Sequence, residues 1–250
     1  MDVYAIIFTG LAFITLLFFF TKIVDLNTKD EKDDDRTSRE LFYGTSDEEF
    51  RNIKSKNDGE IGEEVIYHYL LKIGILERQI LRNVYLPTND DETTEIDILV
   101  ASRRGILVLE CKNYSGHIYG QGYRRQWVQF LGKGEKYYLY SPIYQNRNHI
   151  RHVREFLGSG RTPIIPFTVV TPKGKWKVSD IQPNDHFIYY YDFKSEYEKL
   201  PPDVLSNEDI KSLIELFKPY SDVPSKISVT HINRVKQIQM NYKNKWRSNP

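Results

Sequence analysis

Cysteine is nearly absent from this chain, because Cys111 is the only one among 250 residues. A single cysteine cannot form an intrachain disulfide, and without companion cysteines a structural zinc site is not expected. A reducing compartment therefore suits the protein. The sequence also lacks internal repeats, a glycine-rich phosphate loop ending in Lys-Ser or Lys-Thr, and a serine-hydrolase nucleophile elbow, so it gives no support for ATP dependence.

Net charge is almost absent as well, since 35 basic residues balance 34 acidic ones. The charges are nevertheless unevenly distributed along the chain. Residues 25–64 carry 14 acids and 7 bases, a net of −7, whereas residues 101–177 carry 14 bases and 3 acids, a net of +11. A basic segment of this kind suits a surface that meets phosphates, and surface solvation by Lys and Arg is the alternative.

One long apolar run is present, at the N-terminus. Residues 3–21 contain no charge and are long enough, as a helix, to cross the roughly 30 Å hydrocarbon core of a bilayer. A cleaved signal peptide is disfavoured because Asp2 precedes the run without any Lys or Arg, and no small-residue cleavage site follows it. Flanking cations occur only after the run. We therefore expect a single-pass anchor of the cell membrane in residues 1–24, with the N-terminus outside, and an acidic flexible tether in residues 25–54.

Two later apolar segments contain charged residues. Residues 105–112 begin with glycine and end in Glu110-Cys111-Lys112, and strand periodicity would place Glu110 and Lys112 on the same face. Asp97 is embedded among aliphatic residues, where an unpaired charge is costly. A short turn at residues 102–105 separates the two segments. A hairpin would therefore bring the three side chains to one region.

Two carboxylates beside an ammonium group suit Mg²⁺-assisted hydrolysis of phosphodiesters. Carboxylate oxygens are ligands for a hard cation, and a positive group can position the attacking water and stabilise developing charge. An acid and a lysine at a strand end are more often a solvated pair, and a Glu-x-Lys tripeptide alone is weak evidence. The additional strand acid, Asp97, favours the catalytic interpretation.

Further short motifs occur before, around and after these residues. They are Gly-Glu-Ile-Gly-Glu at 59–63, Glu-Ile-Asp at 95–97, Leu-Glu-Cys-Lys-Asn-Tyr-Ser-Gly at 109–116, Trp-Val-Gln at 127–129 and Ser-Pro-Ile-Tyr-Gln-Asn at 141–146. In this combination the chain resembles the nuclease-related domain (NERD) family of the PD-(D/E)xK nuclease superfamily. The resemblance covers residues 55–172. One departure is Ile98, which stands where the family often has a His after the strand Asp.

The resemblance implies an α/β fold, a restriction-endonuclease-like mixed central sheet flanked by helices, here with an N-terminal transmembrane helix. Residues 173–250 are expected to form a C-terminal α/β extension that packs on the domain. Glu63 resembles the helix acid that completes the metal site. Asp97, Glu110 and Glu63 are thus the expected ligands of Mg²⁺ or Mn²⁺, with Lys112 acting on the attacking water and the transition state.

The helix at 142–157 carries the next expected site residue. The resemblance places Gln145 beside the active centre, where it would orient a phosphate or the lysine. His149 is four residues further along and so shares a helix face with Gln145. A purely structural bridge from these two side chains to the sheet suits the spacing equally well.

Local patterns predict the following elements. Helices are expected at residues 59–73, with Asp58 as the cap, and at 142–157, 207–217 and 229–244; strands are expected near 80–85, 95–101, 105–112, 125–131, 136–140, 164–171 and 186–193.

The sequence therefore predicts a membrane-anchored, Mg²⁺-dependent nuclease that acts on nucleic acid, with DNA favoured over RNA. The alternative is a catalytically inactive module of the same fold that binds nucleic acid or protein at the membrane. Arginines in the basic segment are the expected phosphate contacts: Arg103, Arg104, Arg124, Arg125, Arg147 and Arg151.

Overall fold

The computed structural model describes residues 57–88, 93–158 and 162–221. The expected membrane anchor, the acidic tether and the expected helix at residues 229–244 lie outside these ranges. Within them, no helix is both long enough and apolar enough to cross a membrane.

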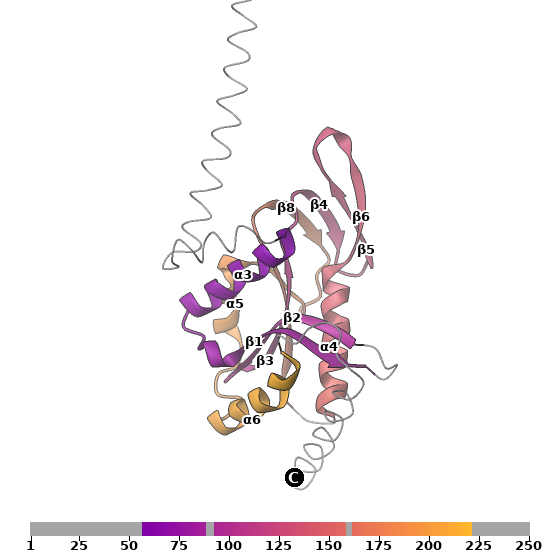
Figure 1. Ribbon diagram of the computed structural model, residues 1–250. Helices are drawn as coiled ribbons and strands as arrows, with labels where there is room; N and C mark the ends of the chain where they lie inside the picture. Colours follow the sequence, from indigo (N-terminus) through magenta and orange to yellow (C-terminus); the bar gives the residue numbers. More distant parts are fainter. Residues whose placement is uncertain (1–56, 89–92, 159–161, 222–250) are drawn as a thin grey trace, which may run out of the picture. The chain divides into compact units, whose positions relative to one another are not determined.

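A five-stranded mixed sheet forms the centre of the fold (Figure 1). Its strands are, in spatial order, β1 (Ile80–Pro87), β2 (Thr93–Ser102), β3 (Gly105–Lys112), β7 (Ile164–Val170) and β9 (His186–Tyr189). The first three run antiparallel to one another, and β7 and β9 continue from β3 in parallel. β3 lies in the middle and is buried as far as Cys111, which explains its apolar run from Gly105 to Leu109.

Helices cover both faces of this sheet, and Figure 1 shows α3 (Asp58–Lys72) and α4 (Pro142–Leu157) on opposite sides of it. Ser141 caps α4, and Pro142 occupies the first turn, where its missing N–H costs nothing. On the α4 side, Val153 packs with apolar side chains of the sheet and of α6 (Asn207–Phe217). The predicted mixed sheet flanked by helices is therefore confirmed, as are both bounds of α4 and α6.

The cap of α3 differs from the prediction. Asn57, rather than Asp58, is the N-cap: its Oδ1 accepts a hydrogen bond from the Glu60 amide at 3.1 Å. The Glu60 carboxylate in turn accepts from the Asn57 amide, and Asp58 is the first helical residue. This reciprocal pair uses two amides that no helical carbonyl reaches.

A second sheet of four strands was not predicted. Its strands are, in spatial order, β6 (Lys136–Tyr140), β5 (Gln126–Phe130), β4 (Gly116–Gln121) and β8 (Gly174–Ser179). Neighbours are antiparallel except β4 and β8, which are parallel. The sequence indicated β5 and β6, whereas β4 and β8 are short and partly exposed. One face of this sheet is apolar, and buried Ile118 and Trp127 pack there with Ile143 of α4.

The predicted strand at residues 186–193 is too long. β9 ends at Tyr189, and the chain turns through η3 (Tyr190–Asp192) into α5 (Phe193–Lys199). Phe193 is buried against Phe167 of β7, with ring centroids 4.8 Å apart. The remaining short helices are η1 (Glu77–Gln79), η2 (Gly132–Gly134) and η4 (Lys218–Tyr220).

Candidate functional site

The β2–β3 hairpin places two carboxylates opposite one another. Its residues pair from Ser102 and Gly105 at the turn to Ile98 and Leu109. Asp97 and Glu110 are the next residues along each strand, just past the last of these pairs. Asp97 Oδ2 accepts a hydrogen bond from the Cys111 amide at 2.7 Å, which fixes the carboxylate at the end of β3. Lys112 remains in register with β7 through Val170.

Glu110 joins a chain of polar contacts across the sheet. Its side chain is fully buried, and its Oε1 forms an ion pair with Lys112 Nζ. Its Oε2 lies 3.0 Å from Nε2 of His149 on α4, and Nδ1 of the same ring lies 2.9 Å from Thr94 Oγ1 on β2. With Glu110 ionised, His149 Nε2 donates to it. The ammonium of Lys112 is therefore held by a carboxylate that is itself held by α4.

Negative charge is concentrated around Asp97. Burial raises the pKa of Asp97 well above its usual range, and the neighbouring Glu110 charge raises it further. Burial alone would lower the pKa of Lys112, but the charges of Glu110 and Asp97 raise it by more, so the ammonium stays protonated. Burial and the Asp97 charge raise the pKa of the Cys111 thiol well above normal, which keeps this thiol out of nucleophilic chemistry.

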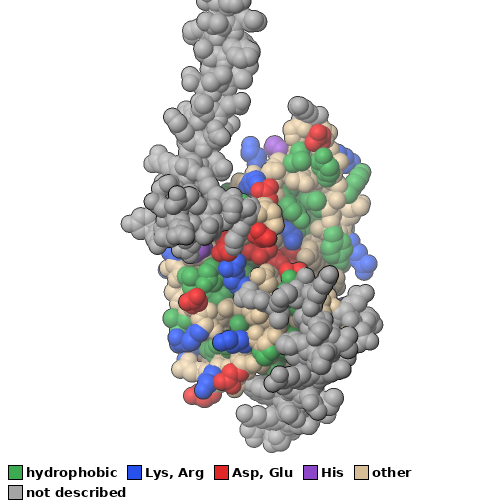
Figure 2. Space-filling model, in the orientation of Figure 1, with side chains coloured by type: hydrophobic (Ala, Val, Ile, Leu, Met, Phe, Trp, Pro, Cys, Tyr) green, Lys and Arg blue, Asp and Glu red, His purple; other side chains and the backbone are tan. Residues whose placement is uncertain are grey.

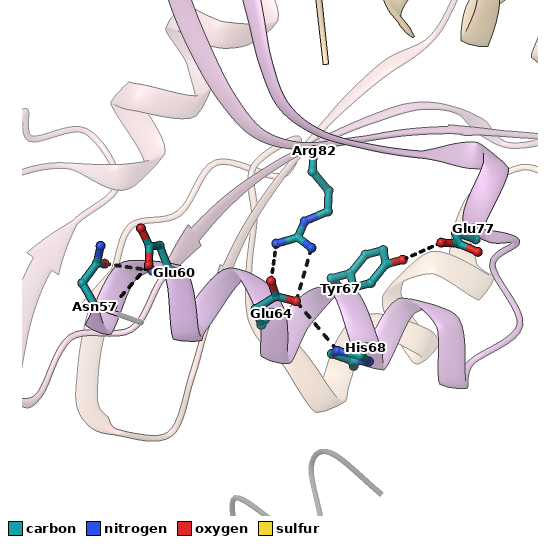
Figure 3. A network of polar contacts seen from close by, with 7 residues as sticks. All are labelled: Asn57, Glu60, Glu64, Tyr67, His68, Glu77 and Arg82. Atoms are coloured by element: carbon teal, nitrogen blue, oxygen red, sulfur yellow. Dashed lines mark hydrogen bonds and ion pairs between the residues drawn. The ribbon is translucent and has the colours of Figure 1, made fainter. Parts of the chain in front are cut away.

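Glu63 is the acid of α3 that lies in the site. The Glu60 side chain belongs to the N-cap, and Glu64 makes two hydrogen bonds with the Arg82 guanidinium of β1, at 2.8 and 3.2 Å (Figure 3). Glu63 makes no hydrogen bond or ion pair with any residue that the structure describes. Burial raises the pKa of Glu63, and the Arg82 charge opposes that rise.

A cavity of about 310 Å³ lies between the start of α3 and the ends of β2 and β3. Glu63, Asp97 and Lys112 line it, together with Gln129 of β5. Glu110 is not among the lining residues. Figure 2 shows acidic side chains gathered near the middle of the visible face, close to the start of α3.

Close packing ties α3 to the end of β3. A Cβ atom at Gly62 would lie only 2.6 Å from Cβ of Asn113, so a larger residue cannot be accommodated without a shift. Asn113 Nδ2 donates to the Asp58 carbonyl at 2.7 Å, and Asn113 Oδ1 accepts from the Thr171 hydroxyl. Glu63 is thereby held at a fixed position relative to Lys112.

The donor set suits a divalent cation. Asp97 and Glu63 offer oxygen ligands at one cavity, and burial and the Glu110 charge raise the pKa of Asp97, so a nearby cation would favour its ionised form. Within residues 57–88, 93–158 and 162–221, however, no group of three His, Cys, Asp or Glu side chains converges on one point. Glu110 Oε1 pairs with Lys112 and its Oε2 contacts His149, and this residue does not line the cavity.

His149 was not predicted as a site residue, although it contacts Glu110 directly. The sequence signalled it only through its shared helix face with Gln145. Gln145 lies one turn earlier on α4, does not line the cavity, and its side chain makes no hydrogen bond in the described part of the chain. Of the two, the structure brings His149 to the strand carboxylates.

The six arginines fall in three places. Arg103 and Arg104 lie at the β2–β3 turn, the opposite end of the hairpin from Lys112; Arg103 pairs with Asp203 at 2.6 Å and Arg104 donates to the Leu200 carbonyl. On α4, Arg147 pairs with Asp185 and Arg151 with Glu155. Arg124 and Arg125 lie between β4 and β5, over the rings of Tyr123 and Tyr144.

Comparisons with known proteins show which sequences this chain resembles. A family model described as the nuclease-related domain matches residues 58–171. An uncharacterized protein of Bacillus anthracis is 30% identical over 156 residues, a match that spans 62% of this chain and 73% of the relative. No solved structure matches the chain.

Proposed function

Because the chain belongs to the nuclease-related domain (NERD) family, we propose that it hydrolyses phosphodiester bonds in nucleic acid with Mg²⁺ or Mn²⁺. The observation that carries the proposal is the convergence of Asp97, Glu63 and Lys112 on one cavity at the end of a buried hairpin. A pair of acids and a permanently charged lysine in a desolvated position match the needs of phosphodiester cleavage.

Each side chain has a distinct role in this proposal. Asp97 and Glu63 would hold the cation, and Glu110 would join them on release of Lys112. A bound divalent cation supplies Lewis acidity and lowers the pKa of coordinated water. The Lys112 ammonium stabilises charge on the phosphate, and its side chain is only 15% exposed, where such an interaction is stronger than in water. His149 positions Glu110, and through it Lys112.

DNA is the substrate to test first, and we place the activity at the cytoplasmic face of the cell membrane. Support for the second point comes from the uncharged run at residues 3–21 and from the cations that follow it. A nuclease held there would meet nucleic acid at the inner surface of the membrane.

The direct test is cleavage by the full-length chain. Supercoiled circular DNA, linear DNA and RNA are incubated with Mg²⁺, Mn²⁺ or EDTA, and products are followed by gel electrophoresis. Nicking of the circle with either metal, but not in EDTA, is expected; nicking of a circle establishes endonuclease action. Cleavage of linear DNA alone would restrict the activity to an exonuclease, and cleavage in EDTA would contradict the metal requirement.

A second candidate is a binding module without catalysis. It is favoured by the occupied oxygens of Glu110, which Lys112 and His149 hold in a closed polar chain. Members of one fold can retain the scaffold without the chemistry. Binding of DNA without cleavage under any of the metal conditions above would favour this candidate over the enzyme.

A further inference from the structure

The second sheet has two contrasting faces. Directly paired residues share a face, so the register places Lys177 of β8, Tyr119 of β4, Val128 of β5 and Tyr138 of β6 in one row across the sheet. The alternate residues, such as Trp127, point to the opposite face and are buried there. The row therefore belongs to the side of the sheet that faces away from the core.

The neighbouring row on the same face is also basic and aromatic. It consists of Lys175, His117, Phe130 and Lys136, again by direct pairing. Tyr140 follows on β6, two residues beyond the first row. None of the outward-facing positions on these strands carries an acid. We call this surface, made by the outward-facing residues of β4, β5, β6 and β8, the outer platform.

The rings of the outer platform are accessible. Tyr119 is 40%, Phe130 38%, Tyr138 61% and Tyr140 49% exposed, and Figure 2 shows side chains of the class that includes tyrosine gathered over this part of the molecule. A cation accompanies two of them. Lys136 Nζ lies 4.9 Å from the ring centroid of Tyr138, and Lys177 Nζ lies 5.6 Å from that of Tyr119.

The outer platform also contains a groove of about 550 Å³. Tyr119, Lys177 and Arg124 line it together with the polar side chains of Gln126 and Ser179. The Tyr119 ring for stacking, two cations for phosphates and amides for base edges therefore lie within one open depression.

We propose that the outer platform binds a single-stranded segment of nucleic acid. Tyr119 and Tyr138 would stack on bases, while Lys136, Lys177 and Arg124 contact phosphates. A single strand is specified because bases in a duplex are already stacked and cannot lie on a ring. A membrane surface fits less well, because the groove sets its two valines, Val128 and Val178, among cations, amides and hydroxyls and so offers no continuous apolar face.

This inference rests on the proposed nuclease function and adds to it a binding surface for the substrate. β4 begins at Gly116, shortly after Lys112, and β5 contributes Gln129 to the catalytic cavity and Phe130 to the outer platform. Gln129 and Phe130 point to opposite faces of β5, so a substrate bound on the outer platform would cross this strand to place its scissile bond in the cavity.

Binding is measured in EDTA, so that cleavage plays no part. The full-length chain is titrated into fluorescently labelled single-stranded DNA and into a duplex of equal length, with anisotropy as the signal. Single-stranded DNA is expected to bind more tightly than the duplex. Tyr138→Ala is expected to weaken the affinity for single-stranded DNA about fivefold or more, since stacking contributes roughly 1–3 kcal/mol per base. Lys177→Gln should reduce the salt slope by about 0.7.

Tyr137→Ala is the matched control, because Tyr137 is the adjacent residue of β6, is 47% exposed and points to the other face. Equal effects of Tyr137→Ala and Tyr138→Ala, or duplex binding as tight as single-strand binding, would overturn the inference. So would a Tyr138→Ala defect confined to anionic lipid vesicles. If the outer platform binds single-stranded DNA but the protein never cleaves, only the proposed function is refuted. If the protein cleaves with metal but Tyr138→Ala leaves single-strand binding unchanged, only the outer platform is refuted.

Discussion

At the scale of single residues, the site is defined by a charge imbalance. Asp97 and Glu110 face each other beyond the last paired residues of the hairpin, Lys112 pairs with Glu110, and Asp97 and Lys112 both line the cavity. Burial makes this imbalance costly, which is why the pKa of Asp97 is raised. Perturbed pKa values of this kind concentrate at functional sites.

The raised pKa of Asp97 gives a pH-dependent prediction. The folded protein retains this proton to higher pH than the unfolded chain, so stability from this group falls as pH rises from the ordinary Asp range through the raised pKa. In EDTA, Asp97→Asn and the parent should therefore have the same Tm near pH 4, about the ordinary Asp pKa. As pH rises toward neutral, the Tm of the variant should exceed that of the parent by a growing margin. Thermal melts across this range decide, and a variant less stable than the parent at neutral pH would contradict the charge imbalance.

Lys112→Met should separate catalysis from binding. Loss of the ammonium removes charge stabilisation in the transition state, so turnover should fall by about 10²–10³-fold. Nucleic-acid affinity should change little, because other cations supply most phosphate contacts. Lys211→Met is the control, since this lysine lies on α6 and is 79% exposed. Cleavage by Lys112→Met at the parental rate would exclude a catalytic role for the lysine.

At the scale of elements, much of the fold is predictable from the sequence. A capping serine, Pro142 and an apolar stripe predict the helix at residues 142–157, and an apolar run predicts β3. All of these are local signals. β4 and β8 have weak local signals and exist because they pair with each other and with β5. The contact of His149 with Glu110 depends on how α4 sits on the sheet, which local patterns do not encode.

Gly62→Ala should disturb the site through α3. The added methyl group would lie 2.6 Å from Cβ of Asn113, so α3 must shift, at a cost of about 1–3 kcal/mol in the free energy of unfolding. Glu63 would move with the helix, and cleavage should fall as well. Gly59→Ala is the control on the same helix, because its nearest neighbour is Asn57 Oδ1, the end of a side chain, at 3.3 Å. Equal melts for parent and Gly62→Ala would refute this packing argument.

At the scale of the whole molecule, the two proposed functions belong to two different sheets. The central sheet presents the carboxylates and Lys112 at the ends of β2 and β3, and the second sheet presents the outer platform. The basic excess of residues 101–177 is shared between them. Its arginines at the β2–β3 turn and on α4 are largely engaged with acids and carbonyls, whereas its lysines on β6 and β8 stay exposed.

Membrane attachment is a prediction for the intact chain. Residues 3–21 should hold the protein in the bilayer by apolar burial, which salt does not screen. Cell fractionation should recover the full-length protein in the membrane pellet after washes with high salt and with carbonate. Recovery in the supernatant, or a mature N-terminus beyond residue 20, would contradict an uncleaved anchor.

The central claim is that the site formed by Asp97, Glu63 and Lys112 cleaves nucleic acid with a divalent cation. Its most direct test compares nicking of supercoiled circular DNA by the parent and by Asp97→Asn, each with Mg²⁺ and with EDTA. The parent should nick with Mg²⁺ only. Asp97→Asn should retain its fold but nick at least about 10²-fold more slowly, because it removes a proposed ligand of the cation that stabilises the transition-state charge. Nicking by Asp97→Asn at the parental rate would contradict the claim.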